Sequence, residues 1–235
     1  MPESRVTIEH FSDILCIWAY VGQVRMDELR QQFPDEVSVT YRFIPLFGDT
    51  AVRIGEGWQD RGGFAGYADH VQEIAAGWEH VDVHGGVWRD TAPASSTPGH
   101  LFLKAVQLLY ERGEIASGPQ PELGGRSLPE EAAWRLRHRF FTGAEDIART
   151  EVQDEVAVEL GLPLDDLRAI YANGAAHAML HADLVERDRY QIPGSPTLLM
   201  AGGRQRLFGN VGYRILEANV RELLQNPRSG QASWC

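Results

Sequence analysis

The sequence predicts an α/β fold in which a βαβ unit and a ββα unit are separated by a large all-α insertion. Segments with the composition of β-strands occur near both ends of the 235-residue chain, whereas residues 60–190 show helical periodicity almost throughout. We therefore expect a discontinuous α/β domain formed by residues 1–55 and 190–226. A helical insertion domain at 56–189 and a polar tail at 227–235 complete the predicted organisation.

The βαβ unit is predicted from the first 45 residues. Residues 5–11 are rich in β-branched and aromatic side chains, which is typical of a short buried strand. Apolar residues then recur at helical intervals from residue 18 to about residue 32, and Pro34 ends this helix. Residues 37–43 alternate between apolar and polar, as in a strand with one exposed face. A right-handed crossover is expected between the two strands.

The remaining elements follow from helical periodicity and from the positions of Gly and Pro. A glycine-rich stretch at residues 55–66 predicts a loop before the first insertion helix. The predicted insertion helices span residues 64–76, 98–112, 129–141, 145–160, 163–171 and 175–190. The ββα unit is predicted as strands at 197–201 and 205–208, joined at Gly202-Gly203, and a helix at 213–224.

The composition is that of an ordinary globular protein, and its charge disfavours several classes of partner. The 22 Lys and Arg residues against 33 Asp and Glu give a net charge of -11, which repels nucleic acid and anionic membranes. No apolar run approaches the ~20 residues of a membrane span, and the first residues lack the apolar core of a signal peptide. We expect a cytoplasmic protein with no nucleic-acid or membrane partner.

The cysteines and histidines do not form the pattern of a disulfide framework or a metal site. Cys16 and Cys235 are the two cysteines and lie near opposite ends of the chain. His80 and His84 flank Asp82, but no neighbouring Cys or Glu pair completes a ligand set. The sequence predicts no metal site and no permanently bound cofactor.

Cys16 lies where the first strand gives way to the first helix. Free backbone N–H groups and the helix dipole at such a terminus stabilise a thiolate. This argument predicts a nucleophilic thiol with an apparent pKa below about 7.5, although the charge of Asp13 opposes the shift. The alternative is a small buried hydrophobic residue, because free Cys is among the most buried residue types.

A second candidate segment, Gly194-Ser-Pro-Thr197, precedes the third predicted strand. An X-Pro bond at a sheet edge is a candidate for the cis form, which occurs in about 5% of X-Pro bonds in folded proteins. A cis bond here would present the Ser195 backbone to an extended ligand. The alternative is an ordinary loop proline that limits the edge of the strand.

Together the two segments resemble the DsbA-like thioredoxin superfamily, specifically its cytoplasmic branch that includes the FrnE-type disulfide isomerases. That branch has a Cys-Pro-Trp-Cys-Tyr-x-Gly core, which is matched here by Cys16, Trp18, Tyr20 and Gly22. Residues 194–197 resemble the cis-proline loop of the family.

The resemblance extends to the insertion, where residues 140–147 and 159–162 are similar to the helical pattern of the family. It implies a thioredoxin-like core in which Cys16 is the catalytic nucleophile. The residues that the resemblance assigns to substrate or glutathione binding are Trp18, Tyr20, Ser195 and Pro196.

The chain departs from the family core at two positions, with Ile17 in place of proline and Ala19 in place of the second cysteine. Alanine cannot form a disulfide with Cys16. A mixed disulfide on Cys16 must then be resolved by an outside thiol such as glutathione, or by Cys235 in the tail.

Three functions remain in competition. The leading hypothesis is a DsbA-like thiol-disulfide oxidoreductase or isomerase that uses a single thiol and acts on thiol or disulfide substrates. The alternative is a glutathione-dependent isomerase or transferase acting on glutathione plus a small molecule. This alternative follows from a resemblance of the chain to the related kappa-class glutathione transferases and hydroxychromene carboxylate isomerases, which place a serine where Cys16 stands. The third is a binding module that lost its dithiol. Glutathione is a candidate co-substrate, and a homodimer is left open.

Overall fold

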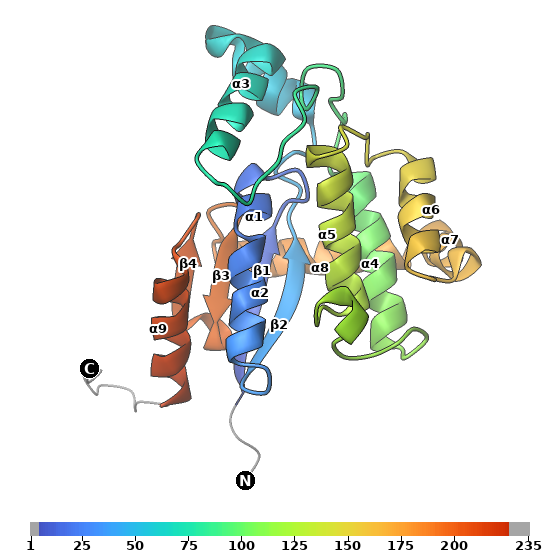
Figure 1. Ribbon diagram of the computed structural model, residues 1–235. Helices are drawn as coiled ribbons and strands as arrows, with labels where there is room; N and C mark the ends of the chain where they lie inside the picture. Colours follow the sequence, from blue (N-terminus) through green and yellow to red (C-terminus); the bar gives the residue numbers. More distant parts are fainter. Residues whose placement is uncertain (1–4, 226–235) are drawn as a thin grey trace.

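The core of the protein is a four-stranded mixed sheet with the strand order β2-β1-β3-β4, as seen in the computed structural model, which describes residues 5–225 (Figure 1). Strands β1 (Val6–Ser12) and β2 (Val37–Phe43) are parallel. Strand β3 (Thr197–Met200) is antiparallel to β1, and β4 (Gln205–Phe208) is antiparallel to β3. This arrangement confirms the predicted βαβ and ββα units.

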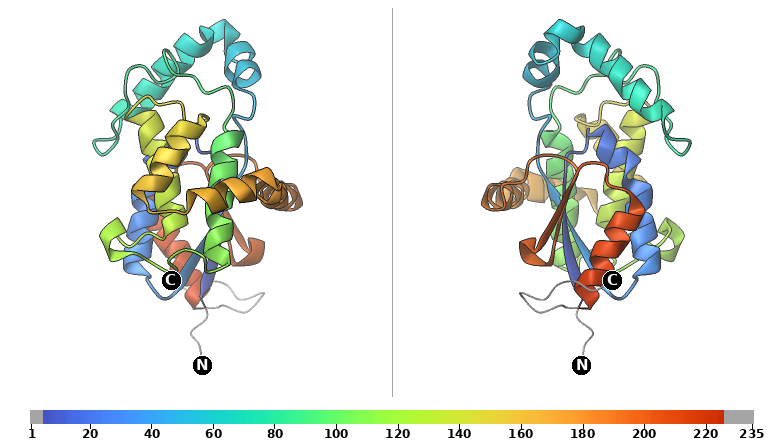
Figure 2. Two further views of the ribbon diagram at one scale, coloured as in Figure 1. Left: turned by 90° about the vertical axis from the view of Figure 1, so that its right-hand side faces the viewer. Right: turned by 90° about the vertical axis from the view of Figure 1, so that its left-hand side faces the viewer.

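Helices cover both faces of the sheet. The single helix predicted after β1 is two helices, α1 (Ile17–Val21) and α2 (Gln23–Gln32), which meet at Gly22. Helices α2 and α9 (Tyr213–Leu224) pack on one face, and α8 (Ala175–Arg189) lies across the other (Figure 2). The buried side chains between α2, α9 and the sheet include Ile8, Met26, Leu29, Met200, Leu216 and Val220.

The segment between β2 and α8 is helical, as predicted. Its elements are the π-helix η1 (Ala51–Glu56), the short helices η2 (Gln59–Arg61) and η3 (Pro121–Leu123), and α3 (Gly63–Ala76), α4 (Thr97–Glu111), α5 (Leu128–Phe141), α6 (Thr150–Glu159) and α7 (Leu164–Ala172). The prediction of a loop in the glycine-rich stretch is wrong in part, because the backbone N–H of Gly57 bonds to the carbonyl of Val52 and closes a π-turn there. None of the helices in residues 5–225 has the length and apolar character needed to cross a membrane.

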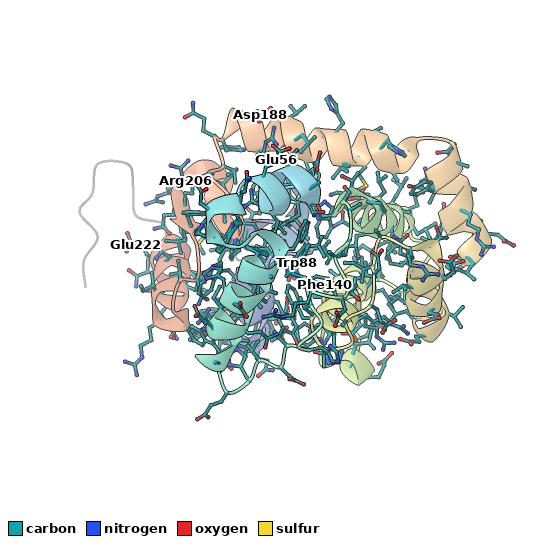
Figure 3. All side chains as sticks on the ribbon, turned by 90° about the horizontal axis from the view of Figure 1, so that it is seen from above. Glu56, Trp88, Phe140, Asp188, Arg206 and Glu222 are labelled. Carbon is teal, nitrogen blue, oxygen red and sulfur yellow. The ribbon has the colours of Figure 1, made fainter. Side chains whose placement is uncertain are left out.

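The helical insertion and the start of α1 share one hydrophobic core. Trp88 and Phe140 are completely buried, and their rings meet edge to face with centroids 5.1 Å apart (Figure 3). The same buried cluster includes Ile14, Leu15 and Ile17, which flank Cys16. The insertion therefore fixes the position of the segment that carries the thiol.

A buried ion pair between two helices of the insertion is also hydrogen-bonded to the sheet. Lys104 of α4 and Asp183 of α8 are each 2% exposed, and the Asp183 carboxylate also accepts a hydrogen bond of 2.7 Å from the backbone N–H of Phe43. We expect Lys104→Met to lower the free energy of unfolding by roughly 3 kcal/mol, because it leaves a buried carboxylate without its nearest counter-charge. Urea denaturation measures the change.

The matched control is the exposed pair between Arg168 and Asp154, in which the Arg168 side chain is 57% exposed. Arg168→Met should change the free energy of unfolding by less than about 1 kcal/mol. Losses of similar size in the two variants would contradict a special role for the buried pair.

Candidate functional site

Cys16 occupies the N-cap position of α1, just beyond the end of β1. Its backbone is extended, with φ -81° and ψ 115°, and its carbonyl accepts hydrogen bonds of 3.1 Å from the N–H groups of Ala19 and Tyr20. The thiol therefore lies at the start of a helix, as the sequence predicts. The helix is only five residues long.

The loop before β3 brings Ser195 and Pro196 against Cys16. The Ser195–Pro196 peptide bond is cis, and the Cys16 thiol donates a hydrogen bond of 3.4 Å to the Ser195 carbonyl oxygen. The Ser195 hydroxyl oxygen in turn accepts a hydrogen bond of 2.9 Å from the backbone N–H of Asp13. Two segments almost 180 residues apart in the sequence are thus joined directly at the thiol.

Asp13 is a buried carboxylate that ties the Cys16 loop to two other segments. One carboxylate oxygen accepts the backbone N–H of Leu15 at 2.8 Å. The other accepts the backbone N–H of Phe47 at 2.9 Å and the hydroxyl of Ser96 at 2.8 Å. Complete burial nevertheless raises the pKa of Asp13 to about 6, against the opposing effect of these hydrogen bonds.

The expectation of a low thiol pKa is wrong. Burial raises the pKa of Cys16 above its ordinary value, and the negative charge of Asp13 acts in the same direction. Hydrogen bonds from Ser195 and from the backbone N–H groups of Ala19 and Trp18 lower it by less. The Cys16 residue is 6% exposed, so loss of hydration outweighs the field of one short helix. The thiol is therefore protonated at neutral pH.

A cavity of about 350 Å³ opens above the thiol. It is roofed by the segment from η1 to α3, and α3 lies above α1 in Figure 1. Its walls are mainly aromatic and carry one cation, and they include Trp18, Phe47, Arg53, Trp58, Tyr67 and His70. Cys16 and Ser195 also border the same cavity, so the thiol is reached from it.

The residues assigned from the sequence lie in three places. Trp18 and Ser195 line the cavity together with Cys16. Pro196 and Ala19 instead line a much smaller pocket of about 30 Å³, between α1, α2 and the β4–α9 segment. Of the four residues assigned to binding, the structure therefore brings Trp18 and Ser195 to the cavity above the thiol.

Tyr20 does not reach the cavity, which corrects the expectation that it binds substrate. Its ring stacks on Phe141 with a centroid separation of 4.7 Å, and its hydroxyl lies 3.1 Å from the hydroxyl of Thr142. Residues two apart on a helix point about 200° away from each other. When Trp18 faces the cavity, Tyr20 must therefore face the insertion.

Sequence reasoning missed the residues that roof the cavity. Arg53 and Trp58 lie in or next to the stretch that was predicted to be a loop, so no face could be assigned to them. Tyr67 and His70 are three residues apart on α3 and therefore share a face. That spacing of two ring-bearing side chains is the one signal in the sequence that points to the roof.

The two histidines considered as metal ligands bond to the backbone. His80 Nε2 lies 3.1 Å from the carbonyl oxygen of Val21, and His84 Nδ1 accepts the backbone N–H of Gly86 at 3.0 Å. Within residues 5–225, no three His, Cys, Asp or Glu side chains are grouped so as to hold a metal ion.

Comparison with known families agrees with this geometry. The chain matches the DSBA-like thioredoxin domain over residues 7–79 and 123–221. The protein belongs to this family. The matched ranges contain the Cys16 segment and the Ser195–Pro196 loop of the DsbA-like protein, together with the roof of its cavity. A comparison with curated proteins gives no match.

Solved structures share the fold of the DsbA-like protein at low sequence identity. A probable DsbA oxidoreductase from Streptomyces coelicolor has a TM-score of 0.71 and 22% identity, with 98% of this chain and 94% of that chain covered. The cytosolic disulfide reductase DsbM from Pseudomonas aeruginosa, in a structure with GSH, has a TM-score of 0.62 and 17% identity over 92% and 99% of the two chains. A 2-hydroxychromene-2-carboxylate isomerase has a TM-score of 0.58 and 12% identity over 94% and 97%.

The raised pKa of Cys16 predicts a characteristic pH dependence. In a Cys235→Ser background, the rate of alkylation of Cys16 by iodoacetamide should rise about tenfold per pH unit from pH 6 to 8.5, because only the thiolate reacts. Mass spectrometry of the labelled peptide gives the rate, and Cys16→Ser in the same background is the control. A plateau reached below about pH 7.5 would show instead that the helix terminus dominates.

Proposed function

We propose that this DsbA-like protein is a cytoplasmic thiol-disulfide oxidoreductase or isomerase that uses Cys16 as its single active-site thiol. The observation that supports the proposal is the contact of 3.4 Å between the Cys16 thiol and the Ser195 carbonyl at the base of a cavity. A thiol in this place meets any sulfur compound that enters the cavity.

The absence of a second cysteine next to Cys16 determines how the reaction is completed. Ala19 stands one helical turn after Cys16 and is 1% exposed, and Cys16 is the one cysteine in residues 5–225. No cysteine among residues 5–225 can release a mixed disulfide from Cys16, so the release needs an outside thiol or Cys235 of the tail. We propose glutathione for this role, which fits a reducing compartment such as the cytoplasm. The fold shared with a DsbM structure solved with GSH supports the choice.

The proposed reaction has two exchange steps. Cys16 loses its proton to solvent, and its thiolate attacks one sulfur of a disulfide. A bond from Cys16 to that sulfur forms as the substrate S–S bond breaks, and the leaving thiolate takes up a proton. A glutathione thiolate then attacks the sulfur of the bound half. This step restores Cys16 and releases a glutathione mixed disulfide.

A restored dithiol tests the single-thiol mechanism. All variants in this experiment carry Cys235→Ser. Treated with glutathione disulfide, the protein with Ala19 unchanged should hold one glutathione on Cys16 as a stable adduct. Ala19→Cys should instead expel that glutathione and form a disulfide between positions 16 and 19, because the two sulfurs lie one helical turn apart. Mass spectrometry distinguishes the two products.

Two variants serve as controls for this experiment. Ala19→Ser adds a side chain of similar size without a thiol and should keep the adduct, while Cys16→Ser should form none. An adduct that persists in Ala19→Cys would contradict the proposed geometry of exchange.

A glutathione-dependent isomerase or transferase is a second candidate, favoured by the protonated state of the resting thiol. A neutral Cys16 that donates a hydrogen bond resembles the serine that holds the glutathione sulfur in the related transferases. The shared fold with a 2-hydroxychromene-2-carboxylate isomerase is consistent with this chemistry.

The activities of Cys16→Ser separate the two candidates, and calorimetry with reduced glutathione checks that the variant still binds glutathione. We expect Cys16→Ser to retain glutathione binding, because serine keeps a donor at the same place, and to lose at least about a hundredfold in disulfide exchange, because a hydroxyl is no substitute for a thiolate. The exchange rate is followed with hydroxyethyl disulfide. Turnover of a small organic substrate that survives in Cys16→Ser would favour the isomerase or transferase.

A further inference from the structure

The cavity above Cys16 contains a cation that the proposed exchange reaction does not use. Arg53 lies on the π-helix η1 and lines the cavity together with Cys16. The Arg53 residue is exposed to solvent, and its guanidinium carbon lies 4.6 Å from the centroid of the Phe47 ring, which also lines the cavity. Short π-helical turns are frequent at functional sites, where they displace a side chain from its regular helical position.

The guanidinium of Arg53 makes no ion pair and no hydrogen bond with residues 5–225. No carboxylate of the described chain lies within 4.0 Å of it, and none of its N–H groups donates a hydrogen bond to a described atom. A guanidinium offers five N–H donors in a planar fork that matches a carboxylate. Its positive charge also lowers the pKa of the buried Asp13, against the larger effect of burial.

The size and walls of the cavity limit what the cation can bind. A volume of about 350 Å³ lies at the small end of the range for small-molecule sites. The cavity is lined in part by rings in mutual contact, with Trp58 and Tyr67 meeting edge to face at 4.9 Å between centroids. A cysteine only 6% exposed at the base of such a cavity is accessible to a narrow molecule and poorly accessible to a disulfide of a folded protein.

We propose that the site is specific for small organic disulfides and thiols that carry a carboxylate, and that Arg53 provides the specificity by binding this group. The inference rests on the proposed function of Cys16 and adds the substrate class. In the first step, the Cys16 thiol and the carboxylate-bearing disulfide give a mixed disulfide on Cys16 and one free carboxylate-bearing thiol. One S–S bond forms as another breaks, and the thiol proton passes through solvent to the leaving sulfur.

The test compares three small disulfides that differ in charge, in a Cys235→Ser background. Dithiodipropionate carries carboxylates, hydroxyethyl disulfide is neutral, and cystamine is cationic. The rate of adduct formation on Cys16 is measured by mass spectrometry and divided by the rate of each disulfide with a free small-molecule thiol. The wild type should favour dithiodipropionate over hydroxyethyl disulfide by at least about tenfold, as expected for a charged hydrogen bond.

Arg53→Gln should abolish this preference, and Arg53→Lys should retain part of it, because lysine keeps the charge without the planar fork. The matched control is Arg61→Gln, which removes an equal charge. The Arg61 guanidinium carbon lies 3.5 Å from the centroid of the Trp58 ring, but Arg61 itself does not line the cavity. Arg61→Gln should leave the preference unchanged.

The possible failures are distinguishable. The role of Arg53 would be overturned if Arg53→Gln kept the preference of the wild type for dithiodipropionate. It would also be overturned if Arg53→Gln slowed all three disulfides equally. Both results would leave the exchange chemistry of Cys16 intact. A loss of preference in Arg61→Gln as large as in Arg53→Gln would also overturn the role of Arg53, since a general surface charge would then explain the result. Absence of a Cys16 adduct with any of the three disulfides would overturn the proposed function itself.

Discussion

The site depends on the hydrogen bonds of one buried carboxylate, that of Asp13. Burying a carboxylate is costly unless donors surround it, and the pKa of about 6 shows that part of this cost remains. The donors come from the Cys16 loop, from the segment after β2 through Phe47, and from the residue before α4, Ser96. The backbone N–H of Asp13 adds the link to Ser195. Four segments therefore meet at one residue, and the thiol lies where they meet.

The same arrangement that positions the thiol also disfavours its ionisation. A charge at a helix terminus is stabilised by about 0.3–1 kcal/mol in ordinary cases, whereas full burial shifts a pKa by as much as 3–5 units. Cys16 begins a five-residue helix, is affected by the negative charge of Asp13, and is only 6% exposed. Burial is the larger effect, so the low pKa expected from the helix start alone does not follow.

The sequence predicted those features that follow from local pattern. Period-two alternation located β2, helical periodicity located the helices of the insertion, and the Ser195–Pro196 segment was recognised before β3. Features that depend on tertiary packing could not be predicted in this way. Tyr20 matched a family motif, but its orientation follows from the helical phase of α1 against the insertion. Arg53 could not be placed because it lies on a π-helix that runs into a stretch whose glycines indicated a loop.

The shape of the cavity also limits the order of events in the proposed exchange. Ala19 closes the side of Cys16 on which a dithiol enzyme would hold its second sulfur, and the pocket that Ala19 shares with Pro196 has a volume of only about 30 Å³. Any resolving thiol must therefore enter through the cavity that admits the substrate. That cavity, at about 350 Å³, lies at the small end of the range for sites that bind a single small molecule. The first leaving group must depart before glutathione can approach, so the two halves of the reaction are separated in time.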